Sequence, residues 1–175
     1  MSNHLKGSLK VLVDYSLSVL LFTLFIAMFY GVTQKRFADL LPVYSFIIFL
    51  MLLGIVYGDI KKLGEKEKRP YNKLNPYPLK GLVLGILGFL PFMLLEVVGF
   101  LLTLDTDFLN RIKHLTLNTL MSPLYWIVRL CGGSALAYAA ASAAVPVIAM
   151  LGYVAGYYGF DSLALFRKIS KGRST

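Results

Sequence analysis

The sequence predicts an all-α integral membrane protein with four transmembrane helices and one short re-entrant or interfacial helix. The chain has 175 residues, 57% of them hydrophobic, and a mean hydropathy of +0.68. Three long stretches, 15–34, 40–58 and 130–160, contain no charged residue. About 20 apolar residues in a helix cross a hydrocarbon core of roughly 30 Å. Runs of this length are expected to lie in a membrane, because a soluble protein of this size could not bury all of them.

The first two spans are expected at 9–32 and 40–58, with the short loop TQKRFAD between them. Lys6 and Lys10 precede an apolar stretch, as basic residues precede the apolar region of a secretory signal peptide. However, the apolar stretch is long for a signal peptide, and no A-x-A cleavage pattern follows it. We therefore expect an uncleaved first span.

A hydrophilic connection at 59–80 follows the second span. It holds seven Lys or Arg residues and three prolines, which remove backbone donors and interrupt helices. We expect a solvated, basic loop on the cytoplasmic side. The basic C-terminal tail, 160–175, is expected on the same side, either as an amphipathic helix on an anionic leaflet or as a frayed end.

The third and last spans are expected at 79–104 and 134–158, with a shorter apolar segment at 115–131 between them. The uncharged core of that segment has 14 residues, which as a helix would measure about 21 Å. It contains Pro123 and is followed by Arg129. This length favours a re-entrant or interfacial helix over a full span. The alternative is a fifth transmembrane helix.

The distribution of basic residues favours four spans. With four, both termini share a side with the basic loop, and thirteen Lys or Arg lie there against five on the other side. With five, the counts become ten and eight. Because basic residues concentrate on the cytoplasmic side of membrane proteins, the larger asymmetry predicts a multi-pass protein of the cell membrane with both termini cytoplasmic.

Glu96 is the only charged residue in the apolar run 82–104. It lies about five residues past the middle of its span, or about 7 Å from the midplane. A charged side chain at the centre of a membrane raises the free energy of insertion by roughly 2.5–3.5 kcal/mol. Three interpretations remain open: a neutral carboxyl bonded to a neighbouring helix, an ion pair with Arg129, or a polar site for a ligand or proton. Asn118 is a further candidate for such a site.

Glycines predict which face of this span packs against other helices. At about 100° per residue, Gly81, Gly85, Gly88 and Gly99 lie within one quadrant of Glu96. Small residues allow helix backbones to approach closely in membranes. Glu96 is therefore expected to face other helices and not lipid.

The last span is rich in small residues, since nine of the twelve residues in 134–145 are Ser or Ala. Ala139, Ala143, Gly152 and Gly156 are the helix-packing candidates on it. This helix is expected either to pack centrally among its neighbours or to offer a docking face to another membrane protein.

Several classes of function are not supported by the sequence. Its net charge of +9 is explained by the membrane-flanking loops, so no nucleic-acid partner is expected. Cys131 is the only cysteine, and His4 and His114 have no neighbouring Cys or His, so no metal site is expected. The chain contains no P-loop, G-x-S-x-G or H-E-x-x-H motif. We expect no enzymatic activity and no cofactor.

Two hypotheses of function follow. The first is a non-enzymatic accessory or scaffold subunit that packs against partner membrane proteins or itself, with its basic loop near anionic lipids of the bilayer. The second is a small-molecule or ion translocating component with a polar site around Glu96 and Arg129. Size and composition are compatible with many small bacterial membrane proteins. Under the second hypothesis, Glu96→Gln abolishes activity in a folded protein, whereas a structural Glu96 tolerates this change.

Overall fold

The computed structural model describes residues 3–68, 77, 79–102 and 107–159, and within these ranges every regular element is a helix. The expected tail at 160–175 and part of the expected loop, 69–76, lie outside the described residues. The elements in chain order are α1 (Asn3–Thr33), η1 (Gln34–Arg36), α2 (Phe37–Glu67), α3 (Lys80–Leu101), α4 (Asp107–Leu120), η2 (Ser122–Leu124), α5 (Tyr125–Leu130) and α6 (Ala135–Tyr158).

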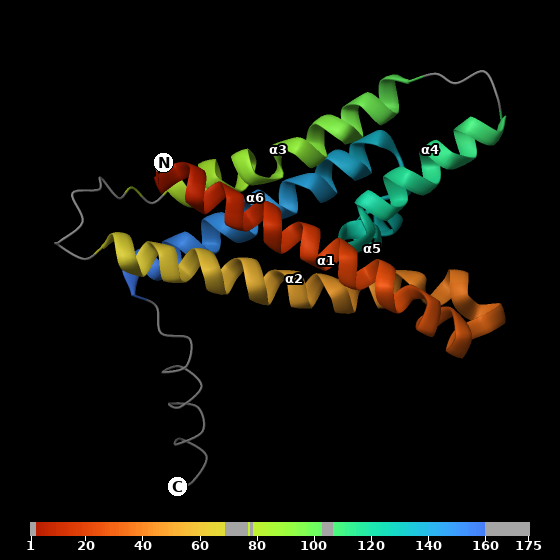
Figure 1. The fold of residues 1–175 in the computed structure, drawn as a ribbon, viewed down its shortest axis with the longest axis horizontal. Helices are drawn as coiled ribbons and strands as arrows, with labels where there is room; N and C mark the ends of the chain where they lie inside the picture. Colours follow the sequence, from red (N-terminus) through yellow and green to blue (C-terminus); the bar gives the residue numbers. More distant parts are fainter. Residues whose placement is uncertain (1–2, 69–76, 78, 103–106, 160–175) are drawn as a thin grey trace, which may run out of the picture.

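Three helical stretches are long and apolar enough to cross a membrane: 4–67, 80–101 and 135–158. The first of them is bent at η1 into an antiparallel hairpin of α1 and α2 (Figure 1). Gln34 has a φ of 42°, a left-handed conformation that is uncommon outside glycine and that reverses the chain here. A hydrogen bond of 3.0 Å from the Tyr44 hydroxyl to the Phe22 carbonyl joins the two arms.

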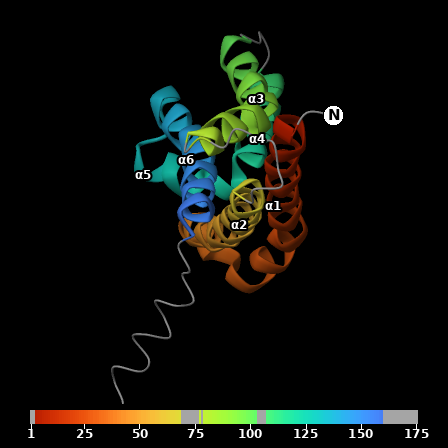
Figure 2. The same ribbon diagram turned by 90° about the vertical axis from the view of Figure 1, so that its left-hand side faces the viewer.

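The four long helices form a bundle in which α1, α2, α6 and α3 follow one another around a ring (Figure 2). The start of α1, the end of α2, the start of α3 and the end of α6 lie together, and we call this the terminal end (Figure 1). The α1–α2 turn and the end of α3 lie toward the opposite end. The core between the helices contains Tyr15, Leu52, Phe89 and Tyr153.

The elements between α3 and α6 enter the core of the molecule where α4 gives way to η2. This segment runs as α4 from the opposite end toward the middle of the bundle, breaks at η2, and continues as α5 (Figure 1). Pro123 lies at the break, where it cannot donate a helical hydrogen bond. Met121, Ser122 and Leu124 are fully buried, so the break lies in the core.

Side chains of α1 and α2 satisfy the backbone groups that the break leaves free. Ser45 donates to the Ser122 carbonyl at 2.7 Å and accepts from the Trp126 N–H at 3.1 Å. The Tyr15 hydroxyl donates to the Leu120 carbonyl at 2.9 Å. Such bonds allow irregular backbone in the core of the molecule, where buried polar groups need a partner.

The spans predicted at 9–32 and 40–58 lie inside α1 and α2, α6 covers all of 134–158 except its N-cap Ser134, and α3 covers most of 79–104. The predicted loop at 59–80 differs from the structure, because α2 continues as a helix to Glu67 and α3 already begins at Lys80. The physical reason is that residues 60, 64 and 67 lie on the buried face of α2, so packing extends the helix past its last apolar turn.

Candidate functional site

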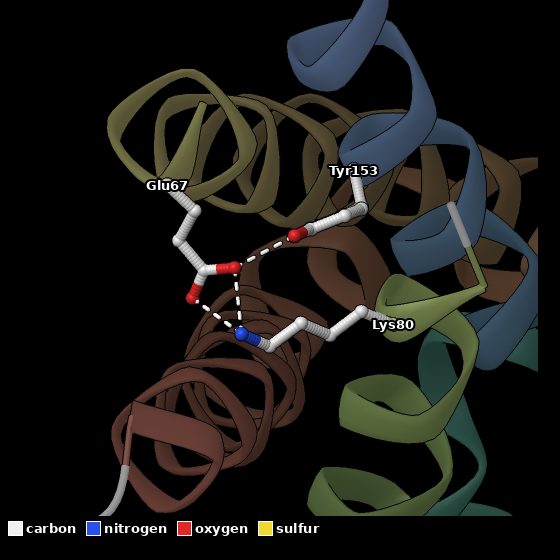
Figure 3. A network of polar contacts seen from close by, with 3 residues as sticks. All are labelled: Glu67, Lys80 and Tyr153. Atoms are coloured by element: carbon white, nitrogen blue, oxygen red, sulfur yellow. Dashed lines mark hydrogen bonds and ion pairs between the residues drawn. The ribbon is translucent and has the colours of Figure 1, made fainter. Parts of the chain in front are cut away.

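A buried ion pair and a tyrosine hydroxyl join three helices at the terminal end of the bundle (Figure 3). The Lys80 ammonium lies 2.7 Å from Oε1 and 2.6 Å from Oε2 of Glu67, and both side chains are only 2% exposed. The Tyr153 hydroxyl donates to Oε2 of the same carboxylate at 2.6 Å. These residues come from α2, α3 and α6, and we call them the terminal cluster.

The terminal cluster was not predicted from the sequence. Glu67 and Lys80 lie thirteen positions apart within the segment expected to be a solvated loop. Two charges in a polar connection give no sign that either is buried. The only hint lies in Gly64 and Gly81, close to the two charged residues, because a Cβ at either position would meet the backbone of α6. α6 thus packs closely beside both members of the pair.

The terminal cluster is a structural clamp. Removing two charges from water costs several kcal/mol per ion, and mutual attraction offsets this only when the geometry is good. Here both carboxylate oxygens contact the ammonium, and the phenol supplies a further hydrogen bond. The contact fixes the end of α2 and the start of α3 against α6, on either side of the connection between them.

Glu96 faces other helices, as its glycine neighbours predict. It is 6% exposed, and its Oε2 accepts a hydrogen bond from the Ser142 hydroxyl of α6 at 2.5 Å. The same hydroxyl lies 4.0 Å from the sulfur of Met121 in the break between α4 and α5. Glu96 therefore joins α3 to α6 beside the buried break.

The structure brings two of the three ligand candidates to one face of α6. Asn118 accepts a hydrogen bond of 2.6 Å from the Tyr138 hydroxyl, and Tyr138 lies one helical turn before Ser142, the partner of Glu96. Arg129 is exposed near the end of α5. The contact partner of Glu96 is thus a serine hydroxyl, which the sequence analysis did not single out.

The glycines predicted to pack helices do so within the molecule. A Cβ at Gly85 would lie 2.6 Å from the Pro146 Cα, and one at Gly152 would lie 2.8 Å from the Tyr57 carbonyl oxygen. The same holds for the remaining candidates, whose Cβ positions meet α6 (Gly81), α1 (Gly88), α4 (Gly99) and α2 (Gly156). Close contacts between helix backbones therefore hold the bundle together toward its terminal end.

The two alanine candidates lie elsewhere. Ala135, Ala139 and Ala143 are exposed and recur every four residues on the half of α6 nearest the opposite end. We call these three residues the alanine strip. The alanines on the other side of this half, such as Ala137 and Ala141, are buried in the core. One helix thus packs inside the molecule with one face and presents small residues outward with the other.

The described residues hold no group of three or more His, Cys, Asp or Glu that could bind a metal ion. The polar contacts of the described chain connect helices: Glu67 to Lys80, Glu96 to Ser142, and Asn118 to Tyr138. Compared with family models, with curated proteins and with solved structures, the chain matches none. Its function therefore has to be inferred from this geometry.

Proposed function

We propose that this chain is a non-enzymatic, multi-pass membrane protein that acts as an accessory or scaffold subunit for partner membrane proteins. The observation that carries the proposal is the division of small residues on α6. Its glycines pack against α2 inside the molecule, while the alanine strip faces outward. A smooth strip with a spacing of four is the kind of surface against which a second helix packs closely in a membrane.

The partnered polar groups support the same proposal. Glu67 and Glu96 are both buried, and each is bonded to a side chain of another helix. Buried polar groups used in this way stabilise one arrangement of helices. A scaffold needs such an arrangement, because its docking surface must keep its shape without the partner.

The proposed topology has four spans in the cell membrane, with both termini cytoplasmic. The α1–α2 hairpin supplies two spans, and α3 and α6 supply the others. The segment α4–η2–α5 is proposed to be re-entrant, because its break is buried in the core of the bundle. The terminal end would then face the cytoplasm, and the basic connection would lie near anionic lipids.

Cys131 gives a direct test of this topology, because it is exposed and is the only cysteine of the chain. With four spans it lies outside the cell, so a membrane-impermeant maleimide should label it in intact cells. With five spans it lies inside, and labelling should require permeabilised cells. The matched control is Cys131→Ser combined with Glu65→Cys at the exposed end of α2, which should react only after permeabilisation. Labelling of Cys131 only in permeabilised cells would contradict the four-span topology.

The alanine strip gives a test of the scaffold role. Tagged protein is recovered from native membranes in mild detergent, and the proteins that accompany it in stoichiometric amount are quantified. Ala143→Trp should reduce their recovery at least about fivefold, because a bulky ring prevents close helix approach. Its thermal stability in isolation should be unchanged, since position 143 is exposed.

The matched control is Leu94→Trp, a change at a 57% exposed position of α3, which should leave the recovery unchanged. Two results would count against the proposal. One is a chain that is recovered alone from native membranes. The other is equal recovery of the accompanying proteins with both tryptophan variants.

A further inference from the structure

A cavity of about 190 Å³, open on the side of the exposed Leu115, lies between the α1–α2 hairpin and the segment α4–η2–α5. Aromatic rings line it from three helices: Phe22 of α1, Phe37 of α2 and Tyr125 of α5. Asn118 and Thr119 of α4 supply the polar part of the lining, together with three aliphatic side chains. The cavity is separate from the terminal cluster and from the contact between Glu96 and Ser142.

Two polar groups of this cavity are unused. The Asn118 side-chain oxygen accepts from the Tyr138 hydroxyl at 2.6 Å, which leaves the two N–H donors of the amide nitrogen. Within the described part of the chain, neither this nitrogen nor the Tyr125 hydroxyl has a hydrogen-bond partner. Both groups therefore remain available to a molecule in the cavity.

Residues that line the cavity are fixed by contacts with residues outside it. The ring of Phe22 packs against Tyr44 with a centroid distance of 4.8 Å, and the Tyr44 hydroxyl bonds to the Phe22 carbonyl at 3.0 Å. Tyr138, which orients the Asn118 amide, packs edge-on against Phe100 at 5.2 Å. A site of this kind is formed before a ligand arrives, as small-molecule sites usually are.

We propose that this cavity binds a small, neutral, single-ring molecule that carries one carbonyl group. The size follows from comparison, since an apolar cavity of about 150 Å³ holds benzene. Neutrality follows from the lining, which contains no charged side chain to compensate a buried ionic ligand. The carbonyl follows from the unused Asn118 and Tyr125 donors, and the ring from the aromatic walls. This inference goes beyond the scaffold role and does not depend on it.

Photolabelling of the full chain in phospholipid nanodiscs tests the site, with 4-azidoacetophenone as the probe and acetophenone as the competitor. Labelling should saturate, should be displaced by the competitor, and should map to residues 22–41 and 115–125. Asn118→Leu and Tyr125→Phe should each raise the half-saturating probe concentration about fivefold, the usual effect of losing one hydrogen bond. Tyr125→Phe removes only a hydroxyl, so it tests the site even where Asn118→Leu disturbs the contact with Tyr138.

The control uses a groove on the other side of α4. This groove of about 330 Å³ lies between α3 and α4 and is lined mainly by apolar residues, together with Lys113 and Thr116. Thr116→Val should leave labelling unchanged, because its hydroxyl already donates to the Ile112 carbonyl at 2.9 Å. Labelling that rises linearly with probe concentration, that maps to the groove, or that is the same in both cavity variants as in the parent chain would overturn the proposal.

Discussion

Replacing Lys80 with methionine is expected to destabilise the protein by about 3–5 kcal/mol, the range measured when one partner of a buried ion pair is removed. Methionine preserves most of the length of the side chain but leaves the Glu67 carboxylate without its cation. Both side chains are 2% exposed, so water cannot replace the lost ammonium. The Tyr153 hydroxyl then becomes the remaining described partner of the carboxylate, and one neutral donor does not compensate a buried charge. Reversible unfolding in mixed micelles measures the loss.

Two further variants separate the buried charge from general damage. The double variant Lys80→Met with Glu67→Gln should recover most of the stability, because it removes both charges and still lets Tyr153 donate to an oxygen. Lys62→Met removes a cation that is 71% exposed and pairs with Asp59 at 3.6 Å. It should change the free energy of unfolding by less than about 0.5 kcal/mol. A double variant no more stable than Lys80→Met would show that the pair is not the cause.

Replacing Gly85 with leucine is expected to destabilise the protein by about 3 kcal/mol, the upper end of the usual range for overpacking. A Cβ at position 85 would lie 2.6 Å from the Pro146 Cα and 3.0 Å from the Ala149 Cβ. Backbone atoms of α6 cannot rotate away as a flexible side chain can. The leucine must therefore separate α3 from α6, and this strains the Glu96–Ser142 contact between the same helices.

Gly54→Leu is the matched control, since it also introduces leucine into a long apolar helix. A Cβ at Gly54 meets no atom within 4 Å, so the side chain enters open space. This variant should unfold at the same denaturant concentration as the parent chain, or slightly above it because leucine favours the helix more than glycine does. Equal losses at positions 54 and 85 would indicate an effect of hydrophobicity and not of close packing.

The face of α3 that packs against other helices could largely be predicted from the sequence. Gly81, Gly85, Gly88 and Gly99 share a quadrant with Glu96, and the structure places other helices against all of these positions. Such an inference is possible at these positions because glycine lets another helix approach closely, although Gly54 and Gly58 of α2 meet no neighbouring atom within 4 Å. The partner of Glu96 was not predictable. Ser142 is one small polar residue in an alanine-rich helix, and nothing local marks which face of α6 meets α3.

The buried break between α4 and α5 could also be predicted only in part from the sequence. Pro123 and the short uncharged core indicate that 115–131 is not an ordinary span. Tyr15 and Ser45, which supply the hydrogen bonds that hold the break, lie 105 and 77 positions away from their partners. Tyr15 lies between Asp14 and Ser16, and Ser45 follows Tyr44, so nothing local distinguishes the residue that bonds the break from its polar neighbours.

The amino-acid sequence alone is enough to predict a helical chain, long helices that are apolar enough for a membrane, and the face of α3 that meets its neighbours. These properties depend on composition and helical period, which are local. The packing of the helices establishes that Glu67 and Lys80 are a buried pair, that Ser142 binds Glu96, and that the alanine strip faces outward. These are contacts between distant segments, and they depend on which helix faces come together, which helical period alone does not specify.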